Sequence, residues 1–291
     1  MTYRIFTDSC SDLPAEYIKK HDDLTVLPLT YSLDGKEYRD DGWVSISMED
    51  FYGRMRRGSI STTSLINVQR FLEAFTPCLE KGEDILYIAF SSALSGTCQN
   101  AMIAAGDLRE QFPDRRITVI DSLCACMGFG MLVTLAQQKK EEGMGYDELV
   151  AWVDDEKLRA VHWFTVDNLN HLRRGGRLST TSAFLGTILS IKPVLHVSDE
   201  GKLVPVEKVK GRRNALRSLV ERTAQTIVDP EQQTLFINHG DALEEARTVA
   251  DMIRERINIR DITINPIGPV IGSHAGPGTI AVFFMGTGRS I

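Results

Sequence analysis

The alternation of apolar runs with helical stretches constrains the fold of this chain more than any other feature. Residues 84–90, DILYIAF, form a continuous apolar run, which is typical of a strand in a parallel sheet covered on both faces. A helix is expected from about Thr97 to Phe112, and the run RITVID then begins a second such unit, whose helix should end before Gly143. Strands alternating with helices form βαβ units. The N-terminal half is therefore predicted to be a Rossmann-like α/β domain with a parallel sheet.

The second half has more β-like runs and fewer helices between them. Residues 194–206, VLHVSDEGKLVPV, are predicted to form a β-hairpin that turns at DEG. This pattern is typical of an α+β domain with a mixed or antiparallel sheet. The charged segment VDDEKLRA, residues 153–160, marks the expected boundary. We therefore predict an N-terminal domain at 1–158 and a C-terminal domain at 159–291.

Composition narrows the class of protein. The 291 residues are 43% hydrophobic and 25% charged, which is ordinary for a soluble globular chain. A net charge of −6 argues against a nucleic-acid partner, because phosphate binding needs a concentrated excess of Lys and Arg. The first residues lack the apolar core of a secretory signal, and the longest charge-free stretch is too short to span a membrane. Five scattered cysteines favour reduced thiols in a cytoplasm over a disulfide framework or a metal site.

Hydroxyl side chains gather where the predicted strands end. The segment FSSALSGTCQNA contains Ser91, Ser92, Ser95 and Thr97, and Thr62, Thr63 and Ser64 precede another helix. In an open α/β sheet, ligands bind outside the carboxyl ends of the strands, near helix N-termini that suit an anion. A single Ser or Thr in such a place more often caps its helix. Several such loops in one sheet favour a shared anion site, and the nearly all-apolar predicted helix 181–191, TSAFLGTILSI, adds the prospect of an apolar cavity.

The common nucleotide and hydrolase fingerprints do not occur in the sequence. There is no GxxxxGK[ST], no GxGxxG after a strand and no GxSxG. NHLRRGGRLS places Arg177 beside two glycines that allow backbone to approach a ligand closely. His274 lies in IGSHAGPG, a Gly/Pro-rich stretch predicted to be a loop before a strand. For His274, a ligand contact and a purely structural role are about equally well supported by the pattern.

These stretches together resemble the DegV family of bacterial fatty-acid-binding proteins along essentially the whole chain. The matching segments are TDSCSDLP, TTSLIN…FLEAF, SSALSGTCQNA, VIDSLCACMG, NLNHLRRGGRLS, KPVLHV…GKLVPVEKVKG and GPVIGSHAGPG, in the order of the family. The resemblance implies a two-domain α/β protein that buries a long-chain fatty acid between its domains. It also implies that the protein presents the acid to a fatty acid kinase for acyl-phosphate formation, with at most transient membrane contact, no cofactor and no catalysis of its own.

The resemblance implies the residues of the binding site as well. The carboxylate would be held by Thr63 and Ser92, with Arg177 and His274 close to the head group. Three further residues complete the expected ligand-binding set, namely Ser64, Ser95 and Gly96. The chain departs from the family after Thr63, where it has Leu65-Ile66-Asn67 in place of the usual Gln-Pro-Ser.

Two other functions remain open on the sequence. The first is a stand-alone phosphotransferase or hydrolase that uses the hydroxyl groups with His274 as base, although no nucleotide fingerprint or nucleophile elbow accompanies them. The second is a protein whose interaction with a partner responds to lipid and that takes no part in a metabolic pathway. Residue patterns alone predict a two-domain α/β protein with an anion site. Only the family resemblance implies that the anion is a fatty acid.

Overall fold

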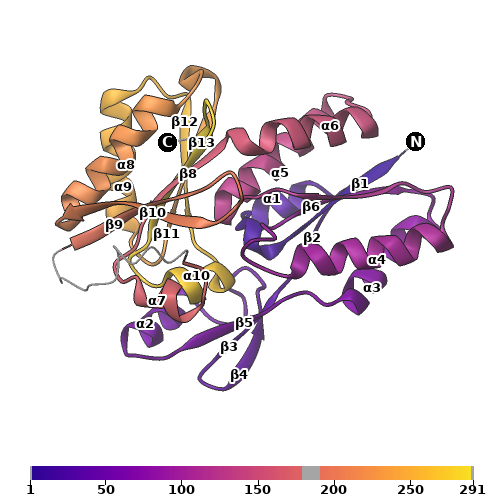
Figure 1. The fold of residues 1–291 in the computed structure, drawn as a ribbon, viewed down its shortest axis with the longest axis horizontal. Coiled ribbons are helices and arrows are strands. Elements are labelled where there is room, and N and C mark those ends of the chain that lie inside the picture. The colour runs from indigo at the N-terminus through magenta and orange to yellow at the C-terminus, as the bar shows by residue number, and fades with distance from the viewer. Residues whose placement is uncertain (1, 179–190, 290–291) are drawn as a thin grey trace.

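The parallel sheet predicted for the N-terminal half is present in the structure, a computed structural model that describes residues 2–178 and 191–289. Its strands are β1 (Tyr3–Asp8), β2 (Leu24–Leu27), β6 (Asp84–Ala89) and β7 (Ile117–Asp121), in the order β2-β1-β6-β7. All three pairings are parallel, and β6 is buried along its whole length. The helices of this lobe are α1 (Ala15–Lys20), α3 (Val68–Glu80), α4 (Thr97–Gln111), α5 (Cys126–Glu141) and α6 (Tyr146–Glu156). The lobe lies on the right of Figure 1.

A small antiparallel sheet, which the sequence did not predict, lies beside this lobe. It has the order β4-β3-β5, with β3 at Thr30–Leu33, β4 at Lys36–Arg39 and β5 at Ser61–Ser64, and it is accompanied by helix α2 (Met48–Arg56). The run LTVLPLTYSL, residues 24–33, supplies strands to two sheets. It divides into β2 and β3 of different sheets because Pro28 has no N–H to continue a ladder. The TTS segment, expected as a loop, belongs to β5.

The second half forms the predicted mixed sheet, with the order β10-β9-β8-β13-β11-β12. Its strands are β8 (Ala160–Thr165), β9 (Ile191–Val197), β10 (Leu203–Lys210), β11 (Thr234–His239), β12 (Asp261–Pro266) and β13 (Ile280–Met285). Among the described pairings of this sheet, only β11–β12 is parallel, and the predicted hairpin is confirmed as β9–β10. Helices α8 (Arg212–Thr226) and α9 (Leu243–Arg256) cover one face of this sheet (Figure 1). The predicted apolar helix 181–191 lies outside the described residues except for Ile191, which begins β9.

Helix α5 joins the two lobes. It covers most of the charge-free stretch of the sequence, and it is buried on nearly every side along its first two turns, including Met127, Phe129 and Leu132. It packs against β8, β11 and β13 of the mixed sheet as well as against its own lobe. One apolar core therefore continues from the parallel sheet through α5 to the mixed sheet. Among the described helices, none has the length and apolar character needed to cross a bilayer.

A buried carboxylate fixes the strand ends where the site is built. Asp8 is fully buried and accepts hydrogen bonds from the Tyr87 hydroxyl (2.8 Å), the Phe90 N–H (3.2 Å) and the Cys10 N–H (3.0 Å). Burial raises the pKa of Asp8 to about 6, although these three donors oppose the shift. The carboxylate thereby ties the end of β1 to the end of β6, so the loops that follow both strands hold a fixed relative position.

Candidate functional site

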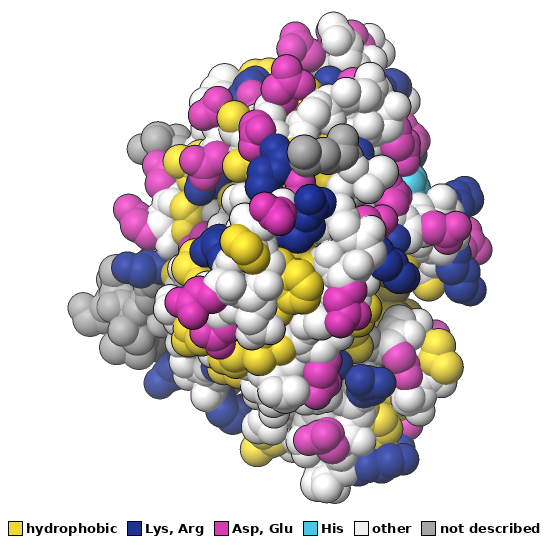
Figure 2. Space-filling model, turned by 90° about the vertical axis from the view of Figure 1, so that its right-hand side faces the viewer, with side chains coloured by type: hydrophobic (Ala, Val, Ile, Leu, Met, Phe, Trp, Pro, Cys, Tyr) yellow, Lys and Arg dark blue, Asp and Glu magenta, His cyan; other side chains and the backbone are white. Residues whose placement is uncertain are grey.

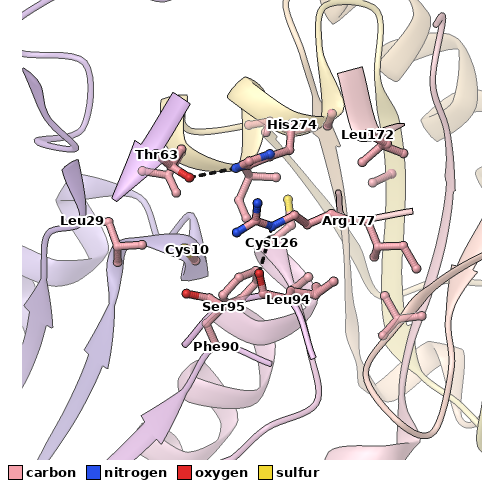
Figure 3. Close-up of a pocket in the computed structure, with 18 of the residues that line it drawn as sticks. Cys10, Leu29, Thr63, Phe90, Leu94, Ser95, Cys126, Leu172, Arg177 and His274 are labelled. Atoms are coloured by element: carbon pink, nitrogen blue, oxygen red, sulfur yellow. Dashed lines mark hydrogen bonds between the residues drawn. The ribbon is translucent and has the colours of Figure 1, made fainter. Parts of the chain in front are cut away.

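An apolar cavity of about 410 Å³ lies between the two lobes. Its walls come from β5 and the loop after β6 on one side, from α5 beneath, and from β8, β13 and a short helix on the other side (Figure 3). That helix, α10, spans Pro269–Ala275 and replaces the loop that the sequence predicted around His274. A cavity built by so many distant segments exists only in the folded chain.

Polar side chains gather at one end of this cavity. Thr63, Ser95, Arg177 and His274 all line it, and Figure 3 shows them facing one another. Thr63 Oγ1 and His274 Nε2 are hydrogen-bonded at 2.8 Å. Ser64 and Gly96 line the same end and are exposed, so this end reaches the molecular surface. Six of the seven residues predicted as ligand-binding are thus brought together.

Ser92 is the predicted residue that the structure does not place there. Its side chain is exposed and it is not among the residues that line the cavity. Its N–H instead donates to Asp121 Oδ1 at 3.1 Å. A tight turn separates Ser92 from Ser95, since the N–H groups of Leu94 and Ser95 both donate to Ser91 O. That turn directs Ser95, rather than Ser92, toward the cavity.

Every other hydroxyl of this segment has a partner in the protein, including Ser95, whose Oγ accepts from the Thr97 N–H at 3.3 Å and lies 3.0 Å from Thr97 Oγ1. Ser91 is fully buried and donates to Gly201 O at 2.9 Å, so it holds the turn of the β9–β10 hairpin against the loop after β6. Thr97 Oγ1 accepts a hydrogen bond from the Ile66 N–H at 3.4 Å. The departure from the family motif is accommodated nearby, because Asn67 caps α3 by accepting from the Arg70 N–H at 2.9 Å.

Helix α10 is held in place from the N-terminal lobe. The N–H of Gly268, just before the helix, donates to Asp12 Oδ1 at 3.0 Å. The buried Tyr52 hydroxyl donates to Ile267 O at 2.8 Å. A Cβ on Gly272 would lie 2.4 Å from that hydroxyl, so a glycine is required at this position of the helix. These contacts fix the helix that carries His274.

Strand β5 contributes alternate side chains to the same helix. Successive residues of a strand point to opposite faces, so Ser61 and Thr63 share one face. Ser61 Oγ lies 2.6 Å from Ser273 Oγ, and Thr63 Oγ1 reaches His274. Thr62, on the other face, is exposed. Thr63 and His274 are therefore held rigidly toward each other before any ligand arrives.

His274 is neutral and has one ring nitrogen free of a protein partner. Burial, and then the nearby Arg177 guanidinium, lower the pKa of His274 to about 4. Its Nδ1 has no hydrogen-bond partner among the described residues. A Cβ on Gly175 would lie 2.2 Å from this Nδ1, which explains the glycine in the RRGGR segment. Any side chain there would displace the imidazole.

Arg177 supplies the positive charge of the site. It is the single Lys or Arg among the described residues that line this cavity. Its Nε donates to Leu94 O at 3.1 Å and its Nη1 donates to Gly175 O, so backbone carbonyls orient the guanidinium. Figure 3 shows the guanidinium beside Ser95, with its remaining donors toward the cavity. A carboxylate at this end would meet a fixed cation and two hydroxyls.

The opposite end of the cavity is apolar. Thr279, Ala281 and Phe283 are alternate residues at the start of β13 and along it, and all three line the cavity. Thr279 Oγ1 donates to Ala275 O at 3.1 Å, next to His274, so β13 leads away from the polar end. The four steps along the chain from Thr279 to Phe283 cover about 13 Å of strand. The site is therefore elongated and polar at one end only.

His162 forms part of the far wall, although no sequence motif marked it as a site residue. It lies opposite Phe283 in the β8–β13 pair, and the two rings meet edge to face at 5.4 Å. Its Nε2 accepts from the Ala125 N–H (3.3 Å), so the hydrogen is on Nδ1, which donates to Ala160 O (2.8 Å). Burial holds the pKa of His162 well below its usual range. The signal in the sequence was a histidine inside the apolar strand AVHWFTV, which alone resembles an ordinary buried residue.

Among residues 2–178 and 191–289, no group of three or more His, Cys, Asp or Glu is arranged to hold a metal ion. On the face shown in Figure 2, Lys and Arg side chains are interspersed with Asp and Glu rather than gathered in one patch. The five cysteines are all buried free thiols, and Cys10 and Cys126 line the cavity.

Comparison with known proteins identifies similar sequences and structures. A family model described as "Uncharacterised protein, DegV family COG1307" matches residues 2–287. A DegV domain-containing protein of Clostridium perfringens is 46% identical over 282 residues, covering 97% of each chain. A solved structure from Thermus thermophilus, described by its fatty acid binding, has a TM-score of 0.86 at 29% identity and covers 97% of this chain and 99% of that one. A fatty acid binding DegV family protein from Streptococcus agalactiae also has a TM-score of 0.86 at 29% identity, covering 97% and 98%.

Proposed function

The chain belongs to the DegV family, and we propose that it binds a long-chain fatty acid in the cavity between its lobes. The observation that carries this proposal is the elongated cavity, which has a cation and hydroxyls at one end and apolar walls along the rest. Similar proteins from Thermus thermophilus and Streptococcus agalactiae are described as fatty acid binding. The domain division at 158/159 belongs to the same proposal, because the mixed sheet begins at Ala160.

The acyl chain supplies most of the binding free energy. Burying each methylene contributes about 0.8 kcal/mol, so the roughly 14 methylenes of a sixteen-carbon acid contribute about 11 kcal/mol before costs. Association entropy and ordering subtract at least about 4 kcal/mol. The remainder is enough for tight binding, so the polar end of the cavity has to orient the carboxylate and replace its hydration.

The carboxylate is proposed to lie among Thr63, Ser95, Arg177 and His274. Each hydrogen bond to a charged group contributes about 1.5–3 kcal/mol. We assign Ser95 rather than Ser92 to this role, since Ser95 lines the cavity and Ser92 faces solvent. The hydroxyls orient the carboxylate, and Arg177 supplies its counter-charge.

We further propose that the protein presents this carboxylate to a separate fatty acid kinase in the cytoplasm and is not catalytic alone. The polar end reaches the surface at Ser64, Leu65 and Gly96, so a partner would have access to the head group. The alternative, a stand-alone phosphotransferase or hydrolase, draws on the Thr63–His274 pair, which has the spacing of a nucleophile and its base. It lacks the usual third group, because His274 Nδ1 has no partner among the described residues to orient it.

The first experiment is mass spectrometry of the organic extract of protein purified without detergent. We expect about one fatty acid per chain. An empty extract, together with no uptake of added palmitate or oleate, would contradict the binding proposal. Incubation of the loaded protein with ATP, with and without a fatty acid kinase, then separates the two functions: acyl phosphate is expected only with the kinase.

Replacement of two neighbouring serines tests the carboxylate assignment. Ser95→Ala is expected to weaken fatty-acid binding about tenfold or more, because it removes a hydrogen bond to a charged group. Ser92→Ala, three residues away, is the matched control and is expected to leave the affinity within about twofold. The dissociation constants are measured with a fluorescent fatty acid and confirmed by calorimetry. If Ser92→Ala weakened binding more than Ser95→Ala, Ser92 rather than Ser95 would hold the carboxylate.

The protonation of His274 provides a second test. In the empty protein the His274 pKa is lowered to about 4, while in the unfolded chain it is near 6.5. The folded state therefore binds fewer protons in this window, and the contribution of His274 to stability is lost as the pH falls from about 6.5 to about 4. A bound carboxylate favours the charged ring, so fatty acid is expected to raise the His274 pKa in an NMR titration. An unchanged pKa in the loaded protein would place the carboxylate elsewhere.

A further inference from the structure

A second cavity, of about 430 Å³, lies on the other side of the loop that follows β1. Its lining shares no residue with that of the fatty-acid cavity. Asp12, Asp40 and Gly268 line it, together with apolar side chains that include Ile18, Val26 and Trp43. The fatty-acid proposal makes no use of this cavity.

Two carboxylates face each other beside Gly268. A Cβ on Gly268 would lie 2.5 Å from Asp12 Oδ1 and 3.7 Å from Asp40 Oδ2. Both oxygens therefore border the space that a side chain at residue 268 would occupy. Asp12 has partners from its own surroundings, since Cys126 Sγ–H donates to Oδ2 at 2.9 Å and the Gly268 N–H to Oδ1. Asp40 is 8% exposed, and its Oδ2 has no partner among the described residues.

Three buried side-chain atoms of residues that line this cavity lack a hydrogen-bond partner among the described residues: Asp40 Oδ2, Ser11 Oγ and Asn265 Nδ2. Buried polar groups in native structures are almost always hydrogen-bonded, so such a set points to an occupant. An ionised Asp40 can only accept, so the group next to its Oδ2 has to donate.

Charge points in the same direction. Burial, together with the neighbouring carboxyls Asp41 and Asp8, raises the pKa of Asp40 to about 7. Burial likewise holds the pKa of Asp12 well above its usual range, with Asp40 and Asp8 adding to the shift. Arg39 is the single Lys or Arg among the described residues that line the cavity; it is exposed and forms none of the described ion pairs. With only the exposed Arg39 nearby, this buried carboxyl pair is neutralised either by protons or by a cationic ligand.

The walls distinguish an organic cation from a metal ion. The described residues contain no group of three or more His, Cys, Asp or Glu that suits a metal. The volume is that of a small molecule rather than of a single ion, and the apolar side chains would contact an alkyl body. Trp43 adds an aromatic ring to the lining, which suits an ammonium group.

We propose that this cavity binds a small aliphatic primary amine, with its ammonium group between Asp12 and Asp40 and its alkyl chain against Ile18, Val26 and Trp43. The ammonium group has three donors for the acceptors that lack partners. This site is separate from the fatty-acid cavity, and the proposal stands whether or not the chain binds lipid.

The test compares n-butylamine with 1-butanol, which has the same alkyl body but no charge. Titrations of the full chain at pH 8 are followed by the indole N–H signals of the three tryptophans, of which Trp43 alone lines the cavity. We expect butylamine to shift the Trp43 signal saturably and to bind at least about tenfold more tightly than butanol. The signals of Trp152 and Trp163 should stay in place and report an intact fold.

Variants locate the ammonium group. Asp40→Asn keeps the shape of the side chain and is expected to weaken butylamine binding about tenfold or more, while Asp22→Asn, at an exposed carboxylate, should leave it unchanged. Equal binding of amine and alcohol to the unaltered protein would overturn the proposal in favour of a purely apolar cavity. Absence of any saturable shift would also overturn it. If Nα-acetyl-lysine amide binds and butylamine does not, the site binds a lysine side chain of a protein instead of a free amine.

Discussion

Arg177→Gln is expected to weaken fatty-acid binding by about 100-fold or more. Arg177 is the one cation among the described residues that line the cavity, and backbone carbonyls of Leu94 and Gly175 already hold it in position. Without it, the carboxylate would lie in a mostly apolar cavity with no counter-charge. Removing one partner of such a charge pair costs about 2–5 kcal/mol, and 2.8 kcal/mol corresponds to 100-fold. Glutamine keeps a donor and part of the side-chain volume, so the change removes mainly the charge.

The same segment provides a matched control. Arg173 belongs to the same RRGGR motif but is exposed and does not line the cavity. Arg173→Gln is expected to leave the affinity within about twofold. The affinities are measured for palmitate and for 1-hexadecanol, because the uncharged alcohol should bind both variants alike. Equal loss for acid and alcohol in Arg177→Gln would show that Arg177 shapes the cavity rather than neutralising the carboxylate.

Gly128→Ala is expected to lower the free energy of unfolding by about 2 kcal/mol and to shorten the cavity. Gly128 lies in α5 beneath the far wall, and a Cβ there would be 2.3 Å from His162 Nε2 and 2.8 Å from Phe283 Cδ1. Both rings are buried, and His162 is held by hydrogen bonds at both nitrogens, so neither can move freely. Overpacking of this kind typically costs about 1–3 kcal/mol. Rings pushed toward the cavity should reduce affinity for stearate more than affinity for laurate.

Gly106→Ala is the control for this change. Gly106 is also inside a long helix, α4, but a Cβ there would meet nothing within 4 Å. Alanine is favoured over glycine in a helix interior by about 1 kcal/mol, so Gly106→Ala should raise stability by up to that amount. Chemical denaturation measures both variants. Stabilisation of both would mean that His162 and Phe283 yield easily and do not define the far end of the cavity.

Much of the fold could be predicted from local patterns. The apolar runs of β6 and β7, each followed by a helical stretch, predicted the parallel sheet, and the hairpin at DEG was also confirmed. The predicted helix from Thr97 to Phe112 is α4, which ends at Gln111. These predictions succeeded because strand burial, helix periodicity and turn residues act within a few residues of the chain.

Predictions failed where distant segments override the local pattern. The TTS segment is a strand because β3 pairs with it, with Tyr31 opposite Thr63. His274 lies in a helix rather than a loop, since Asp12 and Tyr52 hold the start of α10 from the other lobe. None of these partners is near the segment that it contacts in the sequence.

The sequence by itself determined most of the secondary-structure elements, the parallel direction of the strands in the first sheet and the gathering of hydroxyls near strand ends. Only the tertiary structure decided which of those hydroxyls reach the cavity: Ser95 does, Ser91 holds a hairpin turn and Ser92 faces solvent. It also decided that His162 closes the far wall and that Asp12 and Asp40 lie together. The reason is physical, because the direction of a side chain after a turn depends on the turn geometry and on packing partners far away in the chain. Composition and periodicity contain neither.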